Sequence, residues 1–148
     1  MEFDYIVVGA GSSGCVVANR LSANKNVSVA LIEAGSRDSS PWIHIPIGYF
    51  RTIKNPSVNW MYKTEKDTGL NGRSINWPRG KTLGGTSSIN GLLYVRGQQQ
   101  DYDGWAQRGN SGWSWKEVLP YFKKSENWKG PHSTNRGSLG PLTINESE

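Results

Sequence analysis

The feature that most constrains the fold is a glycine motif set between a strand-like and a helix-like segment. Gly9, Gly11 and Gly14 form a G-x-G-x-x-G pattern. The apolar run before it predicts a strand ending at Val8, and the spacing after it predicts a helix over 12–23. In such a motif the first glycine permits a tight turn, the second lets the backbone approach a pyrophosphate, and the third lets the helix pack closely on the strand.

A second strand is predicted over 27–33, because this segment is β-branched and apolar on both faces. Strand, helix and strand make a βαβ unit, whose crossover is almost always right-handed. We expect both strands to be buried, with Val16, Val17 and Leu21 of the helix facing inward. The start of the helix, at Ser12 and Ser13, has unpaired N–H groups and is expected to bind phosphate.

The acidic residue that completes the motif is Glu33, which stands at the end of the second strand and is followed by Ala34. A carboxylate at this place accepts hydrogen bonds from ribose hydroxyls and repels a 2′-phosphate. The pattern therefore predicts a dinucleotide other than NADP. NAD and FAD share the adenosine diphosphate half, so both remain open at this point.

The region after the second strand is expected to be mostly loop as far as residue 79, since four prolines interrupt it. The turn chemistry of 71–73 predicts a junction between two short strands, 61–65 and 74–77. A second glycine-rich segment follows from Gly80, and we expect it to run into a short apolar helix over 88–95.

The carboxyl-terminal part contains one clear helix signal. Ser114 and Glu117 form a capping-box pattern, and we expect Pro120 to kink or shorten the helix that follows. The tail, 137–146, is predicted to be a strand without a partner in this chain. On that basis we expect the chain to be an amino-terminal fragment of a larger protein.

Composition excludes several classes of function. The 17 basic and 12 acidic residues give a net charge of +5 without any basic run, so nucleic acid is not an expected partner. The single cysteine, Cys15, rules out an internal disulfide. The first residues resemble no signal peptide, and no apolar stretch approaches the roughly 20 residues that span a bilayer. We expect a cytoplasmic protein with no transmembrane segment, whose association with the inner membrane, if any, is peripheral.

The second glycine segment resembles a known family. The stretches VVGAGSSGCVVANRLS, LIEAG, NWMYKTE, WPRGKTLGGTSSINGLLYVRG, GWSWKEVLPYFKKSE and GSLGPLTI are together similar to the glucose–methanol–choline (GMC) oxidoreductases. The similarity is greatest to the branch of bacterial choline dehydrogenases and aliphatic alcohol dehydrogenases. It covers essentially the whole chain.

This resemblance implies FAD as the cofactor and assigns residues to its site. Gly84, Gly85 and Thr86 resemble the loop laid against the flavin and its pyrophosphate, where missing side chains and successive N–H groups suit an anion. The remaining residues that we expect near the cofactor are Trp60, Arg79, Gly80, Thr82, Asn90, Gly91, Leu92 and Leu93. Covalently flavinylated relatives have a histidine where this chain has Ile89, so we expect FAD to be bound non-covalently.

The resemblance also implies the reaction. In the family a base takes the hydroxyl proton of a primary alcohol, and the carbon-bound hydride passes to flavin N5, giving an aldehyde. The family's catalytic histidine and its partner lie near the carboxyl terminus of the full-length proteins. We therefore name no catalytic residue here, expect this chain alone to be inactive, and expect a small alcohol and an electron acceptor as partners of the full-length enzyme.

The fold class expected is α/β, a doubly wound, Rossmann-like FAD-binding domain that is incomplete in this chain. We expect 1–130 to be the FAD-binding region and 131–148 the start of a substrate domain. The alternative function is a non-catalytic, truncated module that binds flavin or another nucleotide, and an NAD-binding domain is a third.

Several residues also have ordinary structural interpretations. Trp60 is as well explained by a place in the core as by one near the adenine. Arg79 and Lys81 are either phosphate partners or solvated side chains. His44 and His132 do not match the family's catalytic position, and we expect them to be structural or exposed.

Overall fold

The computed structural model describes residues 2–146. The chain divides into two compact units, Met1–Leu93 and Tyr94–Glu148, which are described in turn. This division falls after Leu93, whereas the functional boundary expected near residue 130 concerns substrate binding and stays a prediction. No helix among residues 2–146 is both long enough and apolar enough to cross a membrane.

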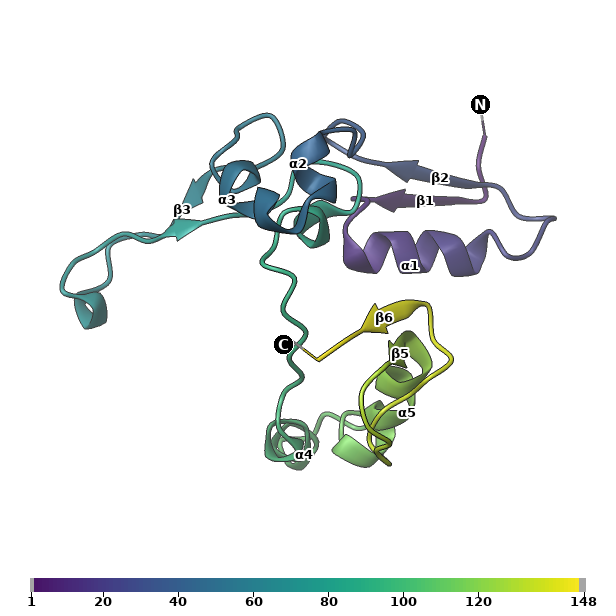
Figure 1. The fold of residues 1–148 in the computed structure, drawn as a ribbon. Coiled ribbons are helices and arrows are strands. Elements are labelled where there is room, and N and C mark those ends of the chain that lie inside the picture. The colour runs from purple at the N-terminus through teal and green to yellow at the C-terminus, as the bar shows by residue number, and fades with distance from the viewer. Residues whose placement is uncertain (1, 147–148) are drawn as a thin grey trace. The chain divides into compact units, whose positions relative to one another are not determined.

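The first unit opens with the expected βαβ arrangement. β1 (Tyr5–Val8) and β2 (Val29–Ile32) are parallel neighbours, and α1 (Ser12–Leu21) connects them. Figure 1 shows the two strands side by side with α1 running along them. The glycine turn begins where the strands end, since the N–H of Gly9 donates to the carbonyl of Ile32 at 2.7 Å. The predicted Rossmann-like α/β class is confirmed.

The burial expected for this unit is wrong in the described residues. Ile6 and Val8 of β1 are 62% and 82% exposed, and Val16 and Val17 of α1 are exposed as well. The reason is geometric, because within residues 2–146 this sheet has two strands, and one helix can cover only part of one face. β1 and β2 therefore have the apolar pattern of central parallel strands, but within the described residues no further elements bury that apolar surface.

The segment between β2 and the second glycine loop is more ordered than expected. It contains α2 (Pro41–His44), the 3₁₀ helix η1 (Pro46–Gly48) and α3 (Tyr49–Thr52). Prolines begin two of these elements, at the position where a missing N–H costs nothing. The predicted pairing of two short strands is confirmed, with β3 (Tyr62–Lys63) antiparallel to β4 (Asn76–Trp77).

The apolar helix expected over 88–95 is absent. The second glycine loop instead forms a 3₁₀ helix, η3 (Gly85–Ser88), and the chain then continues without regular structure. The side chain of Asn90 accepts a hydrogen bond from the N–H of Leu92 at 2.9 Å, and Leu92 has a φ of 62°. This local bond competes with helix formation, and the left-handed backbone of Leu92 excludes a helix.

The second unit contains two capped helices, α4 (Gln99–Gln107) and α5 (Trp115–Ser125). The predicted capping box is confirmed, with the N–H of Ser114 donating to Glu117 at 3.1 Å. Pro120 does not end α5, contrary to the expected shortening, and Phe122 beyond it packs edge-on against Tyr102 of α4 with ring centroids 5.7 Å apart.

The tail strand has a partner, which corrects the expectation from the sequence. β6 (Leu142–Ile144) pairs in parallel with β5 (Glu126–Trp128), directly after α5. The sequence offered little sign of β5, because the run that forms it is only three residues long and mostly polar. The tail therefore gives no indication of a missing strand.

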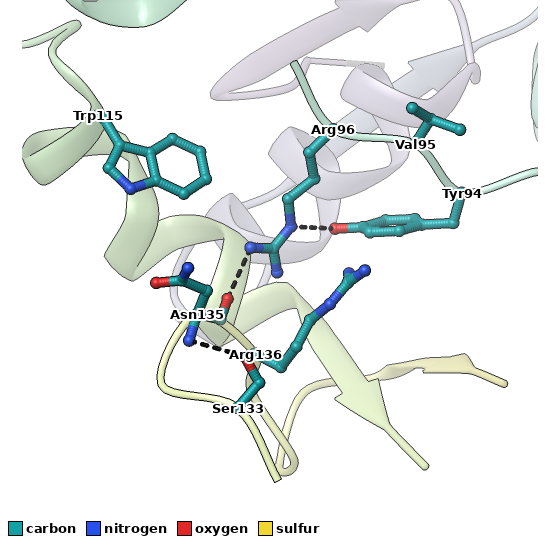
Figure 2. Close-up of a pocket in the computed structure, with 7 residues that line it drawn as sticks. All are labelled: Tyr94, Val95, Arg96, Trp115, Ser133, Asn135 and Arg136. Carbon is teal, nitrogen blue, oxygen red and sulfur yellow. Dashed lines mark hydrogen bonds between the residues drawn. The ribbon is translucent and has the colours of Figure 1, made fainter. Parts of the chain in front are cut away.

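A buried carboxylate organises the second unit. Glu126 is 0% exposed and forms ion pairs with Arg96 and Arg136, while the N–H of Gly137 donates to it at 2.7 Å. Figure 2 shows Arg96 reaching between the hydroxyl of Tyr94 and the carbonyl of Asn135. Burial raises the pKa of Glu126, but the hydrogen bonds from Gly137 and the arginines outweigh it and hold the pKa below its usual value.

This cluster predicts a specific acid sensitivity. Because the folded-state pKa of Glu126 is lowered, the carboxylate stabilises the fold above its unfolded-state pKa of about 4.3, and this contribution is lost as the pH falls below that value. Glu126→Gln should reduce the free energy of unfolding of the complete gene product by about 3 kcal/mol at pH 7, since it removes the carboxylate partner of the buried Arg96 side chain and of the half-buried Arg136 side chain. Urea unfolding at pH 7 and pH 4 measures both effects.

The exposed Glu146 provides the matched control, because Glu146→Gln removes the same charge without touching the cluster. The expected loss at pH 7 should be absent from this control. A Glu126→Gln protein as stable as the control at pH 7 would show that the ion pairs contribute nothing net.

Candidate functional site

The two glycine segments of the first unit pack backbone against backbone. A Cβ atom on Gly85 would lie 2.7 Å from the Cα of Gly11, and Gly85 has a φ of 57°. The N–H of Gly84 donates to the carbonyl of Ala10 at 2.8 Å, and the hydroxyls of Ser12 and Ser87 lie 2.5 Å apart. Contact this close requires glycine, so the second segment is fixed directly on the turn formed by the first.

The three glycines of the first motif differ in what surrounds them. Gly9 has a φ of 93°, as a tight turn requires, and a Cβ on Gly14 would lie 1.8 Å from the carbonyl oxygen of Gly9. A Cβ on Gly11 would meet no protein atom within 4 Å. Gly9 is thus needed for the backbone conformation of the turn and Gly14 for close packing, while Gly11 leaves open space in front of the amino terminus of α1.

Glu33 is a part of the loop structure as well as a candidate ribose ligand. One of its carboxylate oxygens accepts the N–H of Ala10 at 2.8 Å, and the other accepts the N–H of Gly35 at 2.9 Å. A carboxylate offers about four acceptor positions. Two therefore remain for a ligand, and the two that are used hold the glycine turn against the end of β2.

A cavity of about 550 Å³ opens over these elements. The predicted site residues that line it are Gly9, Gly11, Glu33, Ala34, Trp60, Arg79, Gly80, Gly85 and Thr86. The sequence did not single out Tyr62, which lines the cavity beside Val8 and Ile32. Its place in the predicted strand 61–65 was the available signal, and that pattern did not relate it to Trp60, which precedes the strand.

The aromatic wall of this cavity carries positive charge. Trp60 and Tyr62 are stacked, with ring centroids 5.8 Å apart and planes 8° apart. The ammonium of Lys81 lies 4.8 Å from the centre of the Trp60 ring, and the guanidinium of Arg79 lies 4.9 Å from that of Trp77. Trp60 is 41% exposed, so its alternative placement in the core is wrong.

Other predicted site residues do not line the cavity. Thr82 is fully buried, and its hydroxyl donates to the carbonyl of Ser36 at 2.9 Å, so its side chain fixes the second glycine loop. Ile89 is 1% exposed, whereas Leu92 and Leu93 are among the exposed apolar side chains. Contact with a cofactor stays a prediction for the residues that line the cavity and equally for those that do not, namely Ser12, Ser13, Gly14, Thr82, Gly84, Asn90, Gly91, Leu92 and Leu93.

The two histidines take no part in this cavity. Both are exposed, and Nε2 of His44 lies 2.6 Å from the carbonyl oxygen of Asp38. The thiol of Cys15 donates to the carbonyl of Ala10 at 3.2 Å, which makes it a packing group of the glycine turn. Residues 2–146 contain no group of three or more side chains placed to hold a metal ion.

Comparison with known proteins decides the family. The sequence profile described as GMC oxidoreductase matches residues 3–148. This chain belongs to the GMC oxidoreductase family. It is 48% identical over 97% of its length to an alcohol dehydrogenase [acceptor] of Pseudomonas putida, and 46% identical over 95% of its length to an oxygen-dependent choline dehydrogenase of Photobacterium profundum. The resemblance inferred from the sequence is thereby confirmed.

Solved structures agree with this family. A pyridoxine 4-oxidase from Mesorbium loti is 35% identical and superposes with a TM-score of 0.87 over 96% of this chain and 28% of its own. A formate oxidase from Aspergillus oryzae, studied for modification of its FAD, is 33% identical with a TM-score of 0.85 over 99% of this chain and 27% of its own. The expectation of FAD is in agreement with these relatives.

The GMC relatives are much longer than this chain. It spans 26% of the length of the P. putida enzyme and 25% of that of the P. profundum enzyme. What these relatives share with the chain is therefore the region that contains both glycine segments and the cavity between them. Activity and substrate belong to the whole proteins.

The glycine contact yields a test of the site's architecture. Gly85→Ala should lower the free energy of unfolding of the first unit by about 1 to 3 kcal/mol, because the new methyl group overlaps the backbone of Gly11. Gly11→Ala should leave it nearly unchanged, because its Cβ would point into open space. Thermal and urea unfolding of the ligand-free complete gene product measure both. Equal stability of the two variants would contradict the close packing.

Proposed function

We propose that this chain forms the FAD-binding part of an enzyme that oxidises a primary alcohol, such as choline or an aliphatic alcohol, to the aldehyde. The observation that carries the proposal is the open space before Gly11, beside a free pair of acceptor positions on Glu33 and a positively charged aromatic wall. The names of the curated relatives support the alcohol as substrate.

The residues present fit an adenosine diphosphate group. The amino terminus of α1 directs N–H groups at the open space above Gly11, which suits a pyrophosphate. Glu33 has acceptor positions for ribose hydroxyls, and Trp60 and Tyr62 offer a flat apolar surface of the kind on which an adenine ring stacks. Arg79 and Lys81 add positive charge at this wall.

When bound, FAD supplies the hydride acceptor for the oxidation. This chain's share is to hold and orient it. The glycine segments have no side chains that would occupy the space of the cofactor. The buried side chains of Ile89 and Thr82 hold the second segment in place. His44 and His132 do not line the cavity, so we propose that neither serves as the base that takes the alcohol's proton.

The wider proposal includes a small alcohol and a separate electron acceptor. The absence of nucleic acid among the partners and the cytoplasmic location inferred from the sequence stay predictions. The alternative function, a non-catalytic module that binds flavin or another nucleotide, shares the binding site and differs only in lacking a reaction.

The two functions are separated by flavin reduction. We expect the complete gene product to bind FAD more tightly than NAD, and its bound flavin to bleach when primary alcohols are added without oxygen. Gly11→Ala should weaken FAD binding at least tenfold, because its methyl group occupies the space beside the pyrophosphate. Absorbance at the flavin band and titration with each dinucleotide are the measurements.

Each outcome has a distinct meaning. Tighter binding of NAD than of FAD would overturn the cofactor. Bound flavin that no primary alcohol reduces would favour the non-catalytic module instead.

Non-covalent attachment of FAD is a second consequence. Ile89 stands where covalently flavinylated relatives have a histidine, and its side chain is buried and cannot form a bond to flavin. Acid precipitation of the purified holoprotein should release all the yellow colour into the supernatant. Colour that stays with the pellet would show a different point of attachment.

A further inference from the structure

We propose that Asn59 is a positioning residue of the nucleotide site, acting through the backbone of Arg79 and Trp60. The inference rests on the proposed FAD-binding function and adds a residue that does not touch the cavity. Asn59 is 2% exposed, although it lies in a connecting segment between α3 and β3, where polar side chains normally face solvent.

The buried amide of Asn59 joins three separate segments. Its Nδ2 donates to the carbonyl of Ile53 at 2.6 Å, just beyond α3. Its Oδ1 accepts the N–H groups of Met61 and Arg79, each at 3.0 Å. The amide thus acts as a donor at one end and as a double acceptor at the other, and it carries no charge.

The bonds to Oδ1 determine the path of the backbone on both sides of the cavity wall. Met61 has a φ of 57°, which a side-chain-bearing residue adopts only when its surroundings hold it there. The adjacent Trp60 donates its N–H to the carbonyl of Arg79 at 2.9 Å. The amide of Asn59 therefore fixes the backbone of residues 59–61, which positions the Trp60 ring at the cavity.

The same amide reaches the second glycine loop. Directly after Arg79, the N–H of Gly80 donates to the hydroxyl of Thr86 at 3.1 Å, and a Cβ on Gly80 would lie 2.1 Å from the backbone of Gly85. Trp60, Arg79, Gly80 and Thr86 all line the cavity, and Asn59 does not. Asn59 thus sets the distance between Trp60 in the aromatic wall and the second glycine segment.

We expect the aromatic wall formed by Trp60 and Tyr62 to contact the adenosine half of FAD. Glu33 and Gly11 belong to the part of a dinucleotide fold that takes ribose and pyrophosphate, and Trp60 shares their cavity. Asn59 should therefore affect the binding of FAD and of ADP, and leave the binding of FMN, which lacks the adenosine half, nearly unaffected. A merely structural role would not discriminate between these ligands.

The experiment uses the apo form of the complete gene product and three variants. Asn59→Ala removes all three bonds, and Asn59→Asp keeps an acceptor for Met61 and Arg79 while losing the donor to Ile53. The matched control is Asn55→Ala, since Asn55 is a half-buried residue of the same connection whose side chain accepts one backbone N–H, that of Ser57. The measurements are dissociation constants for FAD, ADP and FMN, together with the midpoint of thermal unfolding without ligand.

We expect Asn59→Ala to weaken FAD and ADP about tenfold or more, and the other two variants to weaken them less than about threefold. FMN should change less than twofold in all of them. Folded Asn59→Ala protein with unchanged ADP affinity would overturn the inference, and so would equal losses for FAD and FMN. If Asn59→Ala does not fold, Asn59→Asp decides, since a tenfold loss of ADP affinity in that folded variant also overturns it.

Failure of the proposed function gives a different result. Wild-type protein that binds neither FAD nor ADP would refute the FAD site as a whole. Wild-type protein that binds both, with Asn59→Ala behaving like Asn55→Ala, would refute only the role of Asn59.

Discussion

The backbone contact between the two glycine segments is the constraint on which the site depends. Gly85 lies so close to Gly11 that a methyl group on Gly85 would overlap the backbone of Gly11, and the N–H of Gly84 donates to the carbonyl of Ala10. Glu33 adds bonds to Ala10 and Gly35 from the end of β2. Two glycine segments that are far apart in the sequence thus pack into one surface of the cavity. The backbone N–H groups of this surface are already oriented before a ligand binds.

Some polar side chains stabilise the fold, and others are available to bind a ligand. Buried polar groups such as Asn59, Thr82 and Glu126 are all hydrogen-bonded inside their own unit, as burial requires. Glu33 lines the cavity and has acceptor positions to spare, although it also holds the N–H groups of Ala10 and Gly35, and Lys81 lies over the ring of Trp60 in the cavity wall.

The exposed apolar surface of β1 and α1 is a surface that lacks cover. Its residues follow the pattern of a strand and helix with cover on both sides, yet residues 2–146 supply little cover. The second unit contrasts with this, because its core of Tyr102 and neighbouring rings is joined by a buried ion-pair cluster. The GMC family membership rests on both units, since the matching profile runs through each.

The sequence by itself determined the elements whose signals are local. The spacing of Gly9, Gly11 and Gly14, the acid at Glu33 and the capping box at Ser114 each specify a structure within a few residues, and the family resemblance followed from such motifs. Only the tertiary structure decided the partner of β6, the place of Tyr62 in the cavity and the buried amide of Asn59. These depend on contacts between distant segments, and the isolated residues carry no periodic pattern. The helix expected over 88–95 failed for a different and local reason, since apolar composition did not reveal that the side chain of Asn90 bonds to the backbone of Leu92.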